Sequence, residues 1–384
     1  MGQNEFFQEF TRSTEVKLQI FRAYLRAWLP TFLTKSYQGN VRQIFIGDFF
    51  AGTGCDETEK LGSPGIIFEE IKEYYKKNFD KAADVKIILY FNEYKKKRYE
   101  KLKQNLRAFS EDEIFQKINW KCYVENRKFK EIWQRFNKIR LSNVPCLCIF
   151  DQFGVKEISE EIFKELIDSK KLDFMFFISS NILKRFSRSD EIKGYFPNFD
   201  LASLSAVEQH NLHREVCRQF QEYAVKLDSK YSLIPFTIKK QANIYGIIFG
   251  TSSLRGSEKF LDVAWKLDES AGEADFNIDG NVCYRDQRSL FDEDNTPRKL
   301  QVFENGLLEF IVKKRPNNCE VYRFCLEQGI SIKRSNEVLR GLQNQNKISV
   351  VKPDGNAARK GSFYLTWECY DSREIKAYFS KIKS

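Results

Sequence analysis

The feature that most constrains the fold of this 384-residue chain is a pair of glycines after a short apolar run. Residues 44–46 lead into Asp48, and Gly52 and Gly54 then stand one residue apart before a polar loop. After a buried parallel strand the chain must reverse sharply and let a ligand approach its backbone, which side chains at these glycines would block. The pattern therefore predicts a strand, a tight turn and a helix. Taken alone, a G-x-G pair fits a purely structural turn equally well.

The residues around the glycines indicate which ligand the turn would suit. An acid precedes them, and Asp56 and Glu57 stand where a dinucleotide fingerprint has its third glycine. An acidic turn repels pyrophosphate but suits a cationic or zwitterionic ligand, such as the methionyl part of S-adenosylmethionine (SAM). The next helix is expected to begin at Pro64, with Ser63 as its N-cap. The predicted SAM-binding residues of this segment are Asp48, Phe49, Phe50, Ala51, Gly52, Thr53, Gly54 and Ser63.

Polar residues also follow the next two predicted strands. The apolar run 85–92 ends at Glu93, whose carboxylate is suited to accept hydrogen bonds from two ribose hydroxyls. Glu93 fits equally well as the N-cap of the following helix, and its position leaves both interpretations open. A third strand, 119–124, ends at Glu125 and Asn126, where contacts with adenine are expected.

Further apolar runs complete a predicted sheet. A fourth strand, 146–150, is followed by Asp151-Gln152-Phe153-Gly154, and strands 174–179 and 243–250 come later. An amphipathic helix, 13–35, precedes the sheet and is expected to be interrupted at Pro30. This alternation predicts a doubly wound α/β sheet with a ligand crevice along the carboxyl ends of its strands. Residues 184–236 are interpreted as a mainly helical insertion, which either binds substrate or only packs on the sheet.

The composition favours a polyanionic partner. The chain has 63 basic and 53 acidic residues, a net charge of +10 and a pI of about 9.0. Its nine cysteines form no C-x-x-C pair and it has two histidines, which argues against a zinc site and favours buried free thiols in a reducing compartment. The N-terminus is too polar for a signal peptide, and no apolar run is long enough to span a bilayer. A cytosolic protein that does not enter a membrane is therefore expected.

A second domain, 296–384, is predicted after a polar, acidic linker at 286–295. Helices at 300–312, 318–328 and 332–345 precede a hairpin of 347–351 and 362–367, an order typical of a winged helix. Basic and polar residues suited to nucleic acid lie on the third helix and the wing. Winged helices also dock proteins, so both partners remain open. The candidate nucleic-acid-binding residues are Lys333, Arg334, Asn336, Arg340, Lys352, Arg359 and Lys360.

Several segments resemble the three-Cys-motif partner proteins (TcmP), a methyltransferase-like family. The resemblance covers roughly residues 13–370, and it is carried by the segments E-V-K-L-Q-I-F-R-A-Y-L, I-G-D-F-F-A-G-T-G, L-G-S-P-G, F-N-E, I-F-D-Q-F-G and Y-G-I-I-F-G-T-S. It implies a Rossmann-like class I methyltransferase domain over residues 1–285, with SAM as the cofactor. The family name refers to a partner protein with a cysteine motif, which this chain does not contain. Family members usually have D-P-F-G where this chain has Gln152 in place of the proline.

The residues after the fourth strand suit a methyl acceptor. Asp151 can accept hydrogens from a target base nitrogen, Phe153 can stack on the base, and Gly154 leaves room for it to approach. The same D-Q-F-G segment also fits a tight turn that caps the next helix. Two functions therefore stand: a SAM-dependent methyltransferase that modifies nucleic acid, and a non-catalytic nucleic-acid-binding or adaptor protein with the same fold that works with a partner. The candidate catalytic residues are Asp151, Gln152, Phe153 and Gly154.

Overall fold

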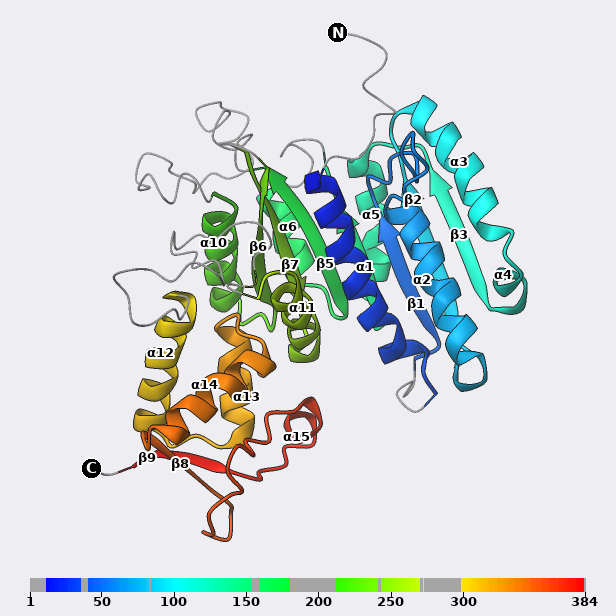
Figure 1. The fold of residues 1–384 in the computed structure, drawn as a ribbon. Helices are drawn as coiled ribbons and strands as arrows, with labels where there is room; N and C mark the ends of the chain where they lie inside the picture. Colours follow the sequence, from blue (N-terminus) through cyan, green and yellow to red (C-terminus); the bar gives the residue numbers. More distant parts are fainter. Residues whose placement is uncertain are drawn as a thin grey trace. The chain divides into compact units, whose positions relative to one another are not determined.

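The computed structural model describes residues 12–35, 41–82, 84–152, 159–179, 212–240, 243–269, 272 and 298–382 (Figure 1). The chain divides into two compact units, Met1–Gly256 and Ser257–Ser384. The predicted linker at 286–295 and the segment 184–211 of the predicted insertion lie outside the described residues.

The first unit is built on a seven-stranded sheet with the order β3-β2-β1-β4-β5-β7-β6. β1 to β5 are parallel, and β7 is antiparallel to both β5 and β6. This mostly parallel sheet with flanking helices confirms the predicted doubly wound, Rossmann-like α/β fold. The strands are β1 (Gln43–Asp48), β2 (Lys86–Asn92), β3 (Trp120–Glu125), β4 (Cys146–Phe150), β5 (Leu172–Ser179), β6 (Ser232–Lys240) and β7 (Asn243–Thr251).

Helices cover both faces of the sheet (Figure 1). One face carries α1 (Arg12–Leu33), α2 (Ser63–Asn78) and α3 (Lys96–Ser110), and the other carries α5 (Phe129–Arg140), α6 (Glu160–Ile167) and α10 (Leu212–Lys226). The remaining elements of the first unit are η1 (Phe79–Lys81) and α4 (Glu113–Lys117), and α11 (Leu254–Leu267) begins in the first unit and continues into the second.

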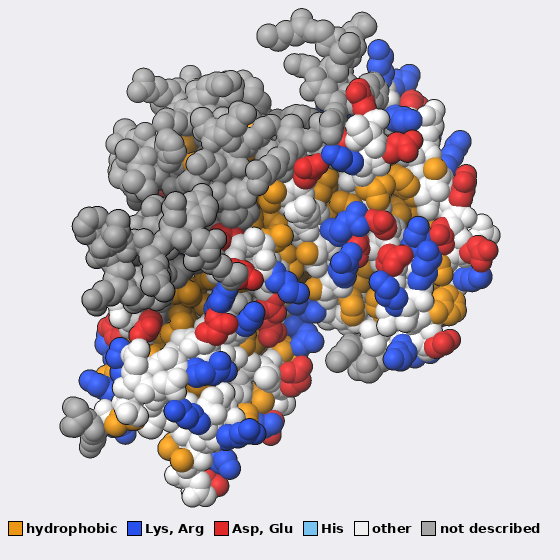
Figure 2. Space-filling model, viewed as in Figure 1, with side chains coloured by type: hydrophobic (Ala, Val, Ile, Leu, Met, Phe, Trp, Pro, Cys, Tyr) orange, Lys and Arg blue, Asp and Glu red, His pale blue; other side chains and the backbone are white. Residues whose placement is uncertain are grey.

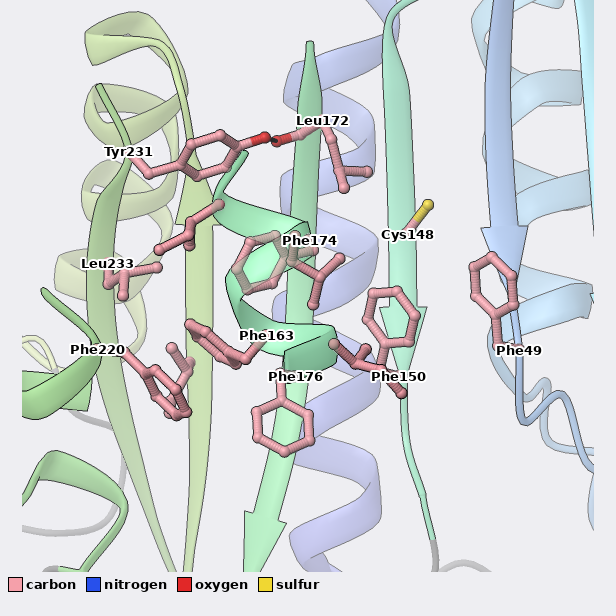
Figure 3. Packing of buried hydrophobic residues seen from close by; sticks show 14 of the residues in the cluster. Phe49, Cys148, Phe150, Phe163, Leu172, Phe174, Phe176, Phe220, Tyr231 and Leu233 are labelled. Carbon is pink, nitrogen blue, oxygen red and sulfur yellow. Dashed lines mark hydrogen bonds between the residues drawn. The ribbon is translucent and has the colours of Figure 1, made fainter. Parts of the chain in front are cut away.

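Aromatic rings fill the core beneath α5, α6 and α10 (Figure 3). The rings of Phe49 and Phe150 stack 5.0 Å apart at 9°, and those of Phe163 and Phe220 stack 3.7 Å apart at 14°. Each buried ring of this size contributes roughly 1.5–3 kcal/mol through removal from water. Phe49 is fully buried in this cluster, so its side chain anchors the start of the glycine turn in the core.

Three local expectations for the first unit were wrong or incomplete. Pro30 does not interrupt the first helix, because α1 continues to Leu33 and buries Leu29 and Leu33 on its inner face. A continuous apolar run such as 85–92 predicts a strand buried on both faces, but the side chains of β2 alternate between half-buried and buried from Lys86 to Phe91. The edge strand β6 was not predicted, and it begins at Ser232, inside the range assigned to a helical insertion.

The second unit contains α12 (Arg298–Lys314), α13 (Asn318–Glu327), α14 (Ile332–Asn344), β8 (Ile348–Val351), α15 (Trp367–Asp371) and β9 (Tyr378–Lys381). The three predicted helices are present, but half of the predicted hairpin was wrong. β8 pairs with β9 and not with residues 362–367. Tyr364 has a φ of 56°, which a strand does not accommodate. The N-cap of α13 is Asn317, in a capping box with Glu320, whereas the sequence pattern predicts Asn318 at this position.

Candidate functional site

The glycine turn is held by the carboxylate of Asp48 at the end of β1. Asp48 is 1% exposed and accepts hydrogen bonds from the Phe50 N–H at 2.9 Å and from the Ser63 hydroxyl. Ser63 is the first residue of α2, and Gly62 is its N-cap, so the predicted capping role of Ser63 was wrong. The hydroxyl joins the start of α2 to the end of β1. Asp48 therefore shapes the turn and places a carboxyl group behind it.

Glu93, after β2, holds the other side of the turn. Its carboxylate accepts the Gly52 N–H at 3.1 Å and the Lys95 N–H at 2.7 Å, one on each oxygen. Each oxygen keeps a further lone pair for a ligand hydroxyl. The N-cap position of α3 is Lys95, which leaves Glu93 outside the capping role. Because the Phe50, Ala51 and Gly52 amides all donate within the protein, they do not form a cradle for phosphate.

The two glycines of the turn differ in their surroundings. Both have positive φ, 62° at Gly52 and 86° at Gly54, a conformation that other residues adopt only with strain. A Cβ at Gly52 would meet no atom within 4 Å, so this glycine borders open space. A Cβ at Gly54 would lie 3.3 Å from Leu102 of α3. Gly52 is therefore the glycine that leaves room for a ligand, and Gly54 allows the turn to pack on α3.

The predicted adenine contacts lie at an open pocket of about 620 Å³ beside the end of β3. The Asn126 amide donates to the backbone carbonyls of Glu93 and Tyr94, each at 2.7 Å. Glu125 forms ion pairs with Arg127 at 3.0 Å and Arg135 at 3.3 Å. Both side chains line this pocket, but in this structure both are engaged with the protein itself.

Asp151, beyond β4, has a partner that the sequence analysis missed. Its half-exposed carboxylate accepts a hydrogen bond from the Lys17 ammonium of α1 at 2.6 Å. The ammonium also lies 4.7 Å from the centre of the Phe177 ring. Gln152 is buried, at 6% exposure, and the predicted acceptor residues Phe153 and Gly154 lie outside the described residues. Lys17 is four residues before the buried Phe21, a spacing that places both on the inner face of α1. This spacing is the feature of the sequence that could have indicated the contact.

The charges of the three strand-end acids influence one another. Burial raises the pKa of Asp48 to about 7, and repulsion from Asp151 and Glu93 adds to the rise. Hydrogen bonds from Ser63 and from the Phe50 N–H act in the opposite direction. The three carboxyl groups therefore share one electrostatic environment at the carboxyl ends of β1, β2 and β4, and a cation placed there relieves their repulsion.

We expect cation binding at this site to depend on pH through Asp48. A bound cation favours the ionised carboxylate, so binding lowers the pKa of Asp48 and releases a proton. Affinity for a cationic ligand, with SAM as the probe, should then rise by up to tenfold per pH unit below about pH 7 and level off above it. Calorimetry across this range measures the effect. The Asp48→Asn variant should remove this rise, because it has no carboxyl group to titrate at this position. Titration of the amino group of SAM affects both proteins equally and so cancels in the comparison. A rise of the same size in the variant would contradict the role of Asp48.

The second unit carries a group of exposed basic side chains, the α14–wing cluster, which consists of Lys333 and Arg340 on α14 and Lys352, Arg359 and Lys360 on the wing. The Gly361 N–H donates to the Gln343 side chain at 3.0 Å and ties the wing to α14. Figure 2 shows basic side chains on the visible face of this unit, with acidic ones among them.

Two of the predicted nucleic-acid ligands are less accessible than the α14–wing cluster. Arg334 pairs with Glu337 at 2.7 Å, donates to the Glu269 carbonyl at 3.0 Å and lies over the Trp265 ring. Asn336 is half-buried. Arg334 therefore serves the packing of this unit in the structure, and the α14–wing cluster holds the charges that face solvent.

A winged-helix family matches the C-terminal region. The family model is described as a GMT-like wHTH domain, and it matches residues 279–355. This confirms the predicted winged helix. No curated protein matches the chain. Among the described residues, we find no helix with the length and apolar content needed to cross a membrane.

Solved structures with a similar fold are methyltransferases, at low similarity. Trm1 from Pyrococcus horikoshii, in complex with SAM, is 12% identical over 69% of this chain and 62% of its own, with a TM-score of 0.37. A class I SAM-dependent methyltransferase described as putative, from Listeria monocytogenes, is 9% identical over 64% of each chain, with a TM-score of 0.29. A methyltransferase from Pyrococcus furiosus is 12% identical over 65% of this chain and 90% of its own, with a TM-score of 0.26. This chain thus spans less than two thirds of the first two proteins, and at these scores the likeness carries no argument about function.

Proposed function

We propose that the protein is a SAM-dependent methyltransferase that modifies nucleic acid, on a base nitrogen. The observation that carries this proposal is the meeting of three strand-end acids, Asp48, Glu93 and Asp151, around a glycine turn that borders open space. They lie where the strand order reverses between β1 and β4, the position at which doubly wound sheets bind their ligands.

The residues of the turn fit SAM better than a pyrophosphate cofactor. The turn amides are already hydrogen-bonded within the protein, whereas the carboxylates of Glu93 and Asp48 suit a ribose and a cationic methionyl end. When bound, SAM would supply a methyl group on a positively charged sulfur, which needs little acid–base assistance to leave. The contribution of the protein is therefore to position the acceptor and to exclude water.

In this proposal Asp151 accepts a hydrogen from the target nitrogen, and Phe153 stacks on the base. Gln152 stands where the TcmP family has proline, and its burial supports a role in packing this strand end. The D-Q-F-G segment would then orient the acceptor through Asp151, and glycine at position 154 adds no side chain to block its approach.

The GMT-like wHTH domain would bind the substrate through the α14–wing cluster. We expect that changing Lys333, Arg340, Arg359 and Lys360 together to Gln weakens DNA or RNA binding and lowers the slope of log affinity against log salt by roughly 0.7–0.9 per lost phosphate contact. Fluorescence anisotropy at several salt concentrations measures both quantities.

The control for this prediction is a variant in which Lys313 and Arg323 are changed to Gln. Each of these residues already pairs with a glutamate on its own helix, at 2.5 Å for Lys313 and 2.8 Å for Arg323. The control should keep nearly the wild-type salt slope. An unchanged affinity and slope in the fourfold variant would instead assign this domain to protein docking.

A second candidate function is a nucleic-acid-binding or adaptor protein without catalysis, which acts with a partner such as a protein that carries a cysteine motif. The observation that favours it is the Lys17 ammonium on Asp151, which occupies the proposed acceptor position. Native mass spectrometry of protein purified from cells separates the two candidates. Co-purified SAM or its demethylated product supports the enzyme, and calorimetry that detects no SAM binding at millimolar concentration supports the adaptor.

A further inference from the structure

Lys17 stands out because it brings a positive charge to an otherwise acidic strand edge. Its ammonium donates to Asp151 at 2.6 Å and lies over the Phe177 ring, and its side chain is only 16% exposed. Asp151 is 41% exposed and remains in contact with water. An ammonium that is mostly shielded from water and pairs with a half-exposed carboxylate is held by that carboxylate, because a charge removed from water without a partner is costly.

The position of Lys17 is fixed by the way α1 is anchored to the sheet. On the same face of α1, Tyr24 and Trp28 donate hydrogen bonds to Asp173 of β5, at 2.7 Å and 3.0 Å. From Lys17 to Tyr24 the helix advances by about 10 Å. From Asp173 to Phe177 the strand advances by about 13 Å. With α1 antiparallel to β5, the helix can thus satisfy Asp173 at one end and place Lys17 over Phe177 at the other.

A second contact ties the start of α1 to the loop that follows the glycine turn. Glu15 accepts a hydrogen bond from Lys60 of that loop at 2.9 Å. The helix that carries Lys17 is therefore held by the sheet through Asp173 and contacts the loop through Glu15. The position of the Lys17 ammonium is therefore set by the packing of α1 on the sheet.

We infer that Lys17 is a specificity-determining residue that cancels the charge of Asp151 at the methyl-transfer position and so limits the preference of the site for SAM over S-adenosylhomocysteine (SAH). This inference rests on the proposed function. SAM carries a positive charge on sulfur, and SAH, its demethylated product, does not. An unpaired Asp151 carboxylate near that sulfur would attract SAM and not SAH, whereas the Lys17–Asp151 pair has no net charge with which to discriminate.

The test is the ratio of SAM to SAH affinity, measured by calorimetry on the full chain. Replacing Lys17 by Met keeps the length of the side chain and removes its charge. In Lys17→Met we expect this ratio to rise roughly 3- to 30-fold, from the Coulomb attraction at an effective dielectric constant near 20. Lys17→Arg should keep the wild-type ratio. The double variant Lys17→Met/Asp151→Asn should return to near the wild-type ratio, because it removes both charges together.

Lys35→Met serves as the matched control. Lys35 follows the other end of α1 and donates to the Asp80 carbonyl at 2.8 Å, so its loss changes the net charge equally but away from the strand-end acids. It should leave the ratio unchanged. A ratio within twofold of wild type in Lys17→Met overturns the inference, as does an increase that persists in the double variant. If the wild type binds neither SAM nor SAH, both the proposed function and this inference fail. If it binds both, and Lys17→Met has the same ratio of affinities as wild type, only this inference fails.

Discussion

Replacing Gly52 by Val should lower the affinity for SAM by at least about a hundredfold while the sheet stays folded. Nothing lies within 4 Å of a Cβ at this position, so the new side chain would occupy the space that we assign to the cofactor. The φ of 62° adds strain of roughly 1–3 kcal/mol, which the turn would relieve by shifting the Gly52 N–H away from Glu93. Calorimetry measures the affinity, and circular dichroism checks the fold.

Gly355→Val is the matched control for this substitution. Gly355 also has a positive φ, 83°, and also has nothing within 4 Å of a Cβ, but it lies in the turn of the wing. It imposes similar backbone strain away from the glycine turn and should leave SAM affinity at the wild-type value. Unchanged SAM affinity in Gly52→Val would show that the cofactor does not approach this turn.

The second large effect is expected at Asp151. Asp151→Asn should reduce methyl transfer by roughly 10²–10⁴-fold, because the neutral amide accepts the hydrogen of the target nitrogen more weakly and carries no charge to stabilise the positive charge that develops on that nitrogen. SAM affinity should fall by no more than roughly 3- to 30-fold, because the Lys17 ammonium then lies uncompensated near the sulfonium, and saturating SAM removes this effect from the transfer rate. Asparagine retains an oxygen that can accept from Lys17, which protects the fold better than alanine would.

The control for Asp151→Asn is Glu113→Gln. Glu113 is an exposed acid that also pairs with a lysine, Lys117, at 3.1 Å, and it lies on α4 away from the strand-end acids. It should keep full activity. If Asp151→Asn transferred methyl groups at the wild-type rate, the assignment of the acceptor position to this strand end would be wrong.

The strand-end acids could be predicted from sequence because each depends on a local pattern. An apolar run followed by an acid identifies Asp48, Glu93 and Asp151 without any knowledge of pairing. The parallel order of β1, β2 and β4 then brings their carboxyl ends to one edge. What the pattern could not show is that Asp48 is turned inward, toward Ser63 and the Phe50 N–H, and acts on a ligand through its charge alone.

Lys17 could not be predicted because its partner is 134 residues away in the sequence. A lysine among buried residues of an amphipathic helix is compatible with a side chain that reaches solvent, and only the packing of α1 on β5 decides its direction. The same limit applies to Arg334, which looks like a phosphate ligand on α14 but pairs with Glu337 and contacts Trp265.

The wing shows a third kind of limit. Residues 362–367 have the apolar content of a strand, and Phe363 and Leu365 are indeed buried. The positive φ of Tyr364 prevents regular pairing, so β8 takes β9 as its neighbour instead. No residue type in this segment predicts a positive φ, because tyrosine adopts one only when the surrounding packing enforces it.

The most direct test of methyltransferase activity is transfer of labelled methyl from SAM to total DNA, RNA and protein pools of the host, with wild type and Asp151→Asn compared. We predict label in a nucleic-acid pool with wild type and its loss in the variant. Label in the protein pool alone, or in no pool despite measurable SAM binding, would contradict the proposed function.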